Sequence, residues 1–504
     1  MRTLYRNGRI LVPAGRGSVG RDTAMLVEGS DIAWVGDERD AAQVSHEAHV
    51  DLGGALVTPA FVDAHVHLTS TGLALTGLDL GSAGSVRELL DHVEALARTS
   101  RGRPIIGGGW DERAWPEQRP PTRAELDRAA YGGAVYLARV DVHSAVVSSA
   151  LLAATEGAAG LTGFRPDGWL TRDAHDAARR AAYAGLTRGQ RLDAQRGALR
   201  HAAELGIACV HEMAGPSISS ATDLADLLEL SRAEALPEVL GYWGELFGAD
   251  TAVALGAIGA GGDLFCDGSL GSHTAALHRP YHDHSESSGA LRYDTADLSE
   301  HLRQCARHGV QAGFHAIGDA AVDQVLDAID AVSPELRPFT RIEHAEMVAA
   351  PARVADSGAV ASMQPVFDST WGGSRGMYAQ RLGAERAASL NDFAALAAAG
   401  VTLAFGSDAP VTPMSPWTAV QAAVHPHRAT SGITPEAAFQ AHTSGGWAAA
   451  GRPGNGRIEL GAPATFAVWL TPGETADLPD LTPGAPLPTC VRTVRAGTTI
   501  HEAA

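Results

Sequence analysis

Eight short apolar runs, most of them ending in a polar residue, constrain this sequence more than any other feature. They end at His67, His211, Trp243, Asp267, His315, His344, Gln364 and Asp408. Alanine-rich stretches such as ARRAAYAGLTRGQRLDAQRGALRHAAELG, which have helical composition, alternate with them. Strands that alternate with helices favour a parallel sheet, and eight such units are the number that closes a (β/α)8 barrel. The sequence therefore predicts an α/β fold built on this barrel.

The two ends of the chain differ from this pattern. Residues 1–57 and 453–504 show short alternating runs separated by turn residues, which are typical of strands and hairpins. We expect them to pair into one composite β-sandwich module beside a barrel formed by residues 58–452. The first two barrel runs are too far apart for a single βα unit, so an inserted α/β subdomain is expected at about 75–185.

Composition excludes several classes of protein. The chain has 504 residues, of which 45% are hydrophobic and 19% charged, as in a globular protein with a sizeable core. Its 39 basic residues are all arginines and face 58 acidic ones, giving a net charge of −19 that disfavours nucleic acid and anionic membranes. Four scattered cysteines and no apolar leader predict a cytoplasmic protein. A small-molecule substrate is the expected partner, and a homodimer stays open.

Histidines at the predicted strand ends indicate a metal site. His65 and His67 are two residues apart on one run, so both imidazoles face the same side of a strand. Other runs end in His315, His344 and Asp408. Because a barrel gathers the carboxyl ends of its strands around one centre, these nitrogen and oxygen ligands converge there. Incidental polar strand ends are the alternative, but burying such groups together without a function is costly.

Five segments in order carry a family resemblance: VTPAFVDAHVHL, DGSLGSHTAAL, FHAIGDAA, RIEHAEMV and GSDAPV. Together they resemble the amidohydrolase superfamily, and within it the YtcJ-like metal-dependent hydrolases, which include N-substituted formamide deformylases. The resemblance covers nearly the whole chain. It implies a distorted (β/α)8 barrel, a divalent metal and hydrolysis of an amide or related C–N bond.

One position departs from the family pattern. Many relatives carry, four residues before the aspartate of the Asp-Gly-Ser motif, a lysine that is carboxylated and bridges two metals; here that residue is Asp263. Its side chain is shorter than a carbamylated lysine by roughly four bonds and needs a backbone shift to reach the same place. Glu212 is the other candidate substitute, with a hydrogen-bonding role at the barrel mouth as the alternative. We therefore expect one tightly held ion and a weak or absent second site.

The expected mononuclear site consists of His65, His67, His315 and Asp408, with an open position for water. Zinc is the first choice, and iron or manganese also suit these ligands. The metal would activate the water at neutral pH. Asp408 would carry its proton to the leaving nitrogen, and His344 would polarise the substrate carbonyl.

Further residues are candidates for substrate binding. Trp110 and Asp111 lie in a Gly/Pro-rich segment of the predicted insertion, where either a closing loop or a packed surface loop is expected. Tryptophans elsewhere could form an aromatic wall or simply pack in the core. The complete set of candidates is Trp110, Asp111, His143, Trp243, Asp267 and Trp371.

Three functions fit these residues. The leading one is an amidase or deacylase that removes an N-acyl or N-formyl group from a small, partly apolar amine. A heterocycle deaminase or cyclic-amide hydrolase would use the same site, but deaminases of this kind usually need a glutamate shortly after the fifth-strand histidine. Residues 316–318 are Ala-Ile-Gly, which favours the amidase. A non-catalytic binding barrel would have decayed ligands, whereas all the candidate ligands are present.

Overall fold

The computed structural model describes residues 1–12, 22–100, 102–140, 144–473 and 478–503. The chain divides into two compact units. The first contains residues 1–67, 199–215 and 224–504, and the second contains residues 68–198 and 216–223.

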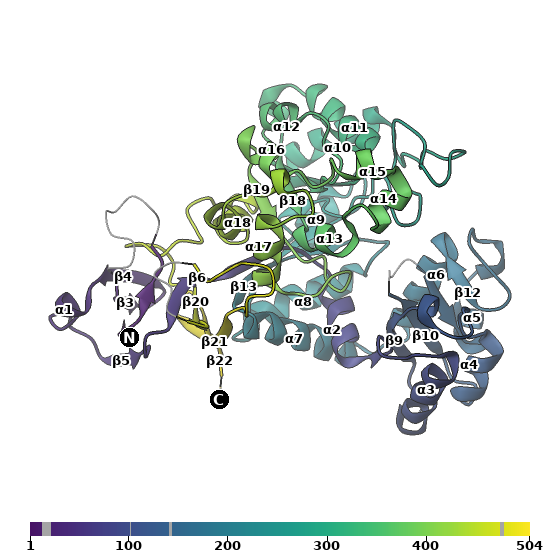
Figure 1. The fold of residues 1–504 in the computed structure, drawn as a ribbon, viewed down its shortest axis with the longest axis horizontal. Coiled ribbons are helices and arrows are strands. Elements are labelled where there is room, and N and C mark those ends of the chain that lie inside the picture. The colour runs from purple at the N-terminus through teal and green to yellow at the C-terminus, as the bar shows by residue number, and fades with distance from the viewer. Residues whose placement is uncertain (13–21, 101, 141–143, 474–477, 504) are drawn as a thin grey trace. The chain divides into compact units, whose positions relative to one another are not determined.

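An eight-stranded sheet forms the centre of the first unit (Figure 1). Its strands are all parallel and follow one another in chain order: β7 (Phe61–Val66), β13 (Ile207–Ala214), β14 (Glu238–Trp243), β15 (Gly259–Ala260), β16 (Gln311–Ala316), β17 (Thr340–His344), β18 (Val360–Met363) and β19 (Leu403–Phe405). The last strand returns to the first through a parallel bridge between Val66 and Ala409. The sheet is thus a nearly closed barrel, and the predicted fold class is confirmed.

Strands of this sheet are buried on both faces, as expected where helices cover the outside of a parallel sheet. All eight residues of β13 and all six of β7 are buried. The helices of this unit are α1 (Glu38–Ala41), α9 (Ala249–Leu255), α10 (Thr295–His308), α11 (Asp319–Asp330), α12 (Pro351–Ser357), α13 (Pro365–Trp371), α14 (Met377–Leu382), α15 (Ala384–Ala387), α16 (Phe393–Ala398), α17 (Pro416–Val424), α18 (Pro435–Ala441) and α19 (Ser444–Ala449). Helices α7 (Arg188–Glu204) and α8 (Ala221–Ala233) belong partly to each unit.

The fourth barrel strand differs from the sequence prediction. The apolar run DLFCDG is expected to be a strand ending at Asp267, but β15 ends at Ala260. Gly261 and Gly262, with φ of 137° and 77°, take the backbone out of the β region immediately after it. The following residues continue outside the regular ladder, with a single bridge between Phe265 and His315.

Strands from both ends of the chain pair beside the barrel (Figure 1). One sheet has the order β2-β6-β20-β21-β22, and β6 pairs antiparallel with β20. A second sheet has the order β4-β3-β1-β5, and the two share an apolar core that includes Tyr5, Val57 and Phe466. The strands are β1 (Arg2–Arg6), β2 (Arg9–Ile10), β3 (Ala24–Glu28), β4 (Asp31–Gly36), β5 (Ala48–Asp51), β6 (Leu56–Pro59), β20 (Phe466–Leu470), β21 (Thr489–Arg495) and β22 (Thr498–Glu502).

The second unit is a five-stranded sheet between helices. Alternate residues of its central strand face opposite cores: Leu137 packs in one core with Leu89, whereas Tyr136 packs in the other with Ala178. The elements are α2 (Leu68–Thr76), β8 (Leu78–Asp79), α3 (Val86–Ser100), β9 (Ile105–Trp110), α4 (Arg123–Ala129), β10 (Val135–Arg139), β11 (Ser144–Val147), α5 (Ser149–Ala154), β12 (Trp169–Thr171) and α6 (Arg172–Ala184).

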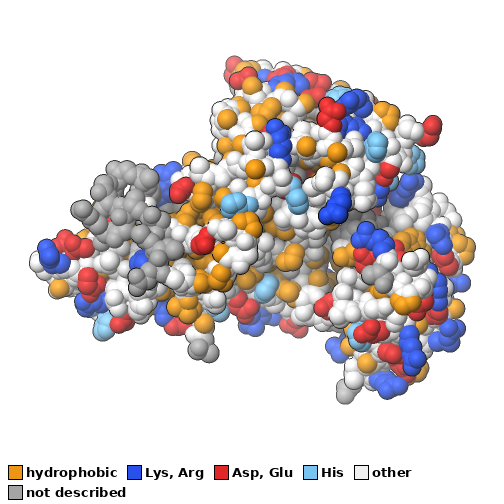
Figure 2. Space-filling view, viewed as in Figure 1, with side chains coloured by type: hydrophobic (Ala, Val, Ile, Leu, Met, Phe, Trp, Pro, Cys, Tyr) orange, Lys and Arg blue, Asp and Glu red, His pale blue; other side chains and the backbone are white. Residues whose placement is uncertain are grey.

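Acidic side chains and arginines are interspersed over the face of the molecule shown in Figure 2. Among the described residues, no helix is both long enough and apolar enough to cross a bilayer.

Candidate metal centre

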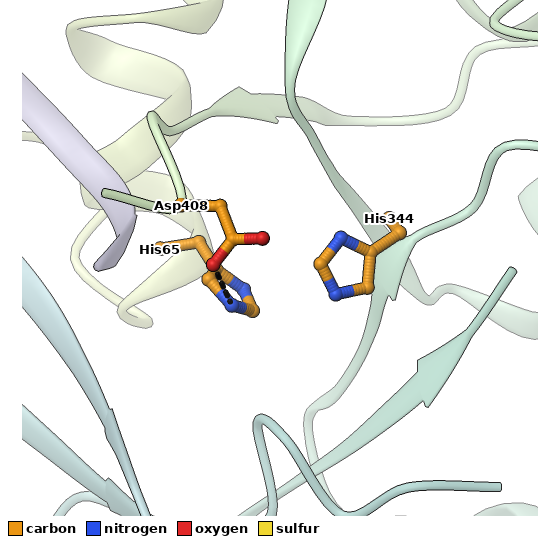
Figure 3. Close-up of side chains that lie close together, drawn as sticks. All are labelled: His65, His344 and Asp408. Carbon is orange, nitrogen blue, oxygen red and sulfur yellow. Dashed lines mark ion pairs between the residues drawn. The ribbon is translucent and has the colours of Figure 1, made fainter. Parts of the chain in front are cut away.

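The four predicted ligands meet at the carboxyl ends of the barrel strands together with His344, which is predicted to polarise the carbonyl. His65 and His67 lie at the end of β7, His315 on β16 and His344 at the end of β17, while Asp408 follows β19. His65 Nε2 lies 3.5 Å from Asp408 Oδ1, and His67 Nε2 lies 3.1 Å from the same oxygen. Figure 3 shows His65, His344 and Asp408 facing a common space. The convergence predicted from strand geometry is therefore present.

The backbone is strained where two of these side chains are attached. His344 and Asp408 have φ of 68° and 54°, a region that costs a non-glycine residue about 1–3 kcal/mol. Asp63, buried on β7, stabilises the second of these turns because its carboxylate accepts from Ser407 N at 2.9 Å and Ser407 Oγ at 2.6 Å. Asp408 N in turn donates to His65 O at 2.8 Å. The strain is thus offset by bonds that join the first and last strands.

Asp263 occupies the middle of the cluster. Its Oδ2 lies 3.5 Å from His65 Nε2 and 3.2 Å from His67 Nε2. Its Oδ1 lies 3.3 Å from His315 Nδ1 and 3.6 Å from His344 Nε2. One carboxylate therefore faces two pairs of histidines, one pair with each oxygen.

Asp263 thus lies at the centre although its side chain is short, which the sequence predicts only with a shift of the backbone. The required backbone shift is present, because Gly261 and Gly262 turn the chain inward directly before Asp263. Only glycine fits there: a Cβ on Gly261 would lie 2.2 Å from the backbone oxygen of Gly313. The path of the backbone at Gly261 and Gly262 therefore compensates for the short side chain of Asp263.

Hydrogen bonds outside the cluster set the proton positions of three imidazoles. The Nδ1 atoms of His65, His67 and His344 lie 3.0 Å from Glu343 Oε2, 2.9 Å from Met213 O and 2.8 Å from Gln364 Oε1, respectively. Each of these oxygens is an acceptor, so each Nδ1 carries a proton and each Nε2 is the nitrogen that faces the cluster. This is the tautomer that metal-ligating histidines adopt.

The centre has the donor set and the electrostatics of a cation site. Within the described chain, His65 Nε2 and Asp408 Oδ1 are buried, and their polar neighbours are one another and other members of the cluster. Burial alone would lower the pKa of His65, but the charges of Asp263 and Asp408 raise it to about 10. Two buried carboxylates thus demand positive charge, and residues of this chemistry fit a divalent ion.

Below the centre, Arg341 and Glu343 form a buried ion pair with Nε–Oε1 at 2.8 Å. Burial raises the pKa of Glu343, but Arg341 and His65 reverse this effect and lower it to about 2. Glu343 is therefore an ionised acceptor for His65 Nδ1–H. The guanidinium of Arg341 also donates to His211 Nδ1, Tyr242 Oη, Ala64 O and Ser362 Oγ.

Other predicted residues lie outside the cluster. Three groups of described side chains could hold an ion, and Glu212, buried on β13, is in none of them. Asp267 accepts from the backbone N–H groups of Ile317, Gly318 and Ala276, so its carboxylate orders the loop around His315. Trp243 is buried at the end of β14, and its Nε1 donates to Glu245 at 2.7 Å.

The remaining substrate-binding candidates have different surroundings. Trp371 packs on Phe367 with ring centroids 4.7 Å apart, and Phe367 stacks on His344 at 6.1 Å with an interplanar angle of 10°. Trp110 is buried in the second unit, where Asp111 pairs with Arg113 and Arg139. His143 lies outside the described residues.

Sequence reasoning missed Glu343, Gln364 and Phe367. Glu343 directly precedes His344 in RIEH, so its position next to a predicted site residue could have identified it. Gln364 ends a predicted strand, which also placed it at the barrel mouth. Phe367 gives no signal, because its contact with His344 depends on the path of α13.

Comparisons with known proteins show the family to which the chain belongs. The sequence model of a family described as "Amidohydrolase family" matches residues 48–501. The protein named YtcJ in Bacillus subtilis (strain 168) is 28% identical over 474 residues, covering 84% of each chain. An N-substituted formamide deformylase from Arthrobacter pascens is 26% identical over 498 residues, covering 88% of this chain and 89% of the relative. The crystal structure of an uncharacterized metal-dependent hydrolase from Pyrococcus furiosus superposes with a TM-score of 0.77 at 28% identity, over 93% of this chain and 98% of the other.

Replacing Glu343 by glutamine tests the hydrogen bond to His65. We expect Glu343→Gln to bind Zn²⁺ about 10- to 100-fold more weakly, as is usual when a metal-ligating histidine loses its carboxylate partner. Competition with a chromophoric chelator measures the affinity, and circular dichroism confirms the fold. Glu238→Gln, which removes an exposed pair with Arg452, is the matched control and should retain normal affinity. Equal affinities in both variants would contradict the assigned role.

Proposed function

Because the chain belongs to the amidohydrolase family, we propose that this metal-dependent hydrolase cleaves the C–N bond of an amide, N-acyl or N-formyl group in a small molecule. One observation carries the proposal: four imidazoles and two carboxylates converge at the carboxyl ends of the barrel strands, with the Nε2 atoms of three imidazoles directed inward. A site of this kind suits hydrolysis of an uncharged, polarisable carbonyl.

We propose two half-sites that share Asp263. His65 and His67 face its Oδ2, and His315 and His344 face its Oδ1. This assignment replaces the single ion expected from the sequence, and it makes His344 a ligand instead of the group that polarises the carbonyl. Zinc is the first choice, with iron and manganese as alternatives for the same donors. The metal, when bound, supplies Lewis acidity toward the carbonyl and activates water near neutral pH.

Asp408 is the proposed proton carrier. Its Oδ1 lies in the cluster, 3.1 Å from His67 Nε2, and its backbone is fixed by Asp408 N donating to His65 O. The carboxylate accepts a proton from the attacking water and transfers it to the leaving nitrogen. Glu343 and Gln364 keep the neighbouring imidazoles in one orientation during these steps.

An apolar substituent fits the side of the centre formed by α13. Phe367, stacked on His344, and Trp371 beyond it form an aromatic surface that begins at the centre. Such a surface would bind the partly apolar portion of an amine or acyl group. The likeness to an N-substituted formamide deformylase supports an N-formyl or N-acyl substrate of this type.

A heterocycle deaminase is the second candidate. It would need an acid near His315 to protonate a ring nitrogen. Residues 316–318 carry no acidic side chain. Of the two carboxylates near His315, Asp263 is the proposed shared ligand, and Asp267 is engaged by three backbone N–H groups. A hydrolysis screen over formamides, N-acyl amines and cyclic amides separates the two candidates by the product released.

Asp408→Asn should lower turnover by at least about 100-fold, because it removes the group that carries the proton. Formate or acid release is measured alongside metal content. Asp356→Asn, an exposed aspartate on α12, is the control and should retain normal activity. Near-normal turnover of Asp408→Asn at unchanged metal content would show that another acid carries the proton.

Metal content tests the shared carboxylate. We expect close to two ions per chain in the wild-type protein after loading and dialysis, and one or fewer in Asp263→Ala, because both half-sites lose a ligand. Elemental analysis of folded protein gives the number. Retention of two ions by Asp263→Ala, or a single ion in the wild-type protein, would contradict the shared-ligand arrangement and favour the mononuclear site.

A further inference from the structure

Phe265 forms an edge of the centre that the proposed hydrolysis leaves unused. It follows Asp263 by two residues and forms an isolated parallel bridge with His315. Its ring centroid is 4.7 Å from that of His315, and Cys266 N donates to His315 O at 3.0 Å. Phe265 is only partly buried although it contacts the buried His315, so its ring connects the solvent-exposed surface with the centre.

Arg292 lies on the outer side of this ring. Its Cζ is 5.2 Å from the ring centroid of Phe265, within the range of a cation–π contact. Arg292 N donates to Cys266 O at 2.9 Å, which fixes the backbone beside the ring. The ring contact with Phe265 and the backbone bond to Cys266 together hold Arg292 beside the segment that leads to Asp263.

No acidic side chain of the described chain pairs with this guanidinium, in a protein whose 58 acidic residues outnumber its 39 arginines. Arg381 is a nearby contrast, because it pairs with Asp283 and donates to Gly271 O. An exposed arginine that is positioned on an aromatic ring and keeps its planar donors free suits bidentate binding of a carboxylate.

The distances limit what this arginine can reach. The two ring contacts place Arg292 Cζ no more than about 10 Å from the His315 ring. A guanidinium–carboxylate pair spans about 4 Å between its carbon atoms. At most about 6 Å then remains between the His315 ring and the carboxylate carbon, which limits the substrate to a carboxylate within about four bonds of the scissile carbonyl.

We propose that Arg292, seated on Phe265, binds a carboxylate of the substrate, so that the preferred substrates are amides with a carboxylate within about four bonds of the scissile carbonyl. N-formyl and N-acyl amino acids with an apolar side chain have this form, and the aromatic surface of Phe367 and Trp371 suits that side chain. The inference rests on the proposed amide hydrolysis and adds its substrate class.

A matched pair of substrates tests this subsite. N-formylphenylalanine and N-formylphenethylamine differ only by the carboxylate, and formate release reports both. We expect wild-type kcat/KM to favour the acid by about 10- to 100-fold, and Arg292→Gln to bring this ratio close to one. Arg279→Gln, which removes another exposed arginine of the same loop, is the control and should keep the wild-type ratio. Added NaCl should raise KM for the acid more in the wild-type protein than in Arg292→Gln.

The other possible results separate the carboxylate subsite from the proposed amide hydrolysis. Equal kcat/KM for both substrates in the wild-type protein, or an unchanged ratio in Arg292→Gln, overturns the carboxylate subsite while amide hydrolysis stands. If neither substrate is cleaved, the proposed function fails, and calorimetry with 3-phenylpropanoate and 3-phenylpropanol tests the subsite alone. Binding of the acid at least tenfold tighter than the alcohol, lost in Arg292→Gln, then supports the subsite; equal binding overturns it.

Discussion

The buried guanidinium of Arg341 is the interaction on which the barrel and its centre depend. It is fully buried, and its donors reach atoms of β7, β13, β14 and β18 in addition to Glu343 on its own strand. A buried charge with every donor engaged is tolerated, whereas removing one partner of such a pair costs about 3–5 kcal/mol. The same cation keeps Glu343 ionised, and Glu343 orients His65. One side chain thus couples the packing of the barrel floor to the geometry of the ligands above it.

The position of Asp263 depends on main-chain flexibility. An aspartate is too short to reach the middle of the cluster from a regular strand, but Gly261 and Gly262 end β15 early and bring the chain inward. The approach is so close that Gly313 on the next strand must also lack a side chain, because a Cβ there would lie 2.3 Å from Gly262 N. Because of these glycines, the fourth strand, β15, has only two residues and few ladder hydrogen bonds. They allow the lysine-free sequence to place a carboxylate between the two histidine pairs.

Features that depend on local periodicity could be predicted from the sequence. The (β/α)8 fold followed from eight alternating runs, and the convergence of His65, His67 and Asp408 followed from two rules: the period of a strand and the common edge of a parallel sheet. The reach of Asp263 could not be predicted in this way, because it depends on the φ angles of two glycines. The role of Glu343 was equally hidden, since its partner His65 lies 278 residues earlier in the chain.

The balance of charge through the barrel connects these features. Arg341 and Glu343 cancel on the floor, so the charge of the layer above is set by Asp263 and Asp408. Burying two carboxylates without a compensating charge is costly. Their effect is visible in the raised pKa of His65, whose protonated form they stabilise. Metal ions that take this role displace protons from the imidazoles, so binding of the ions depends on pH. Two divalent ions would outweigh two carboxylates and leave the centre positive. A positive centre attracts a carboxylate-bearing amide toward the side of the opening where Arg292 lies on Phe265.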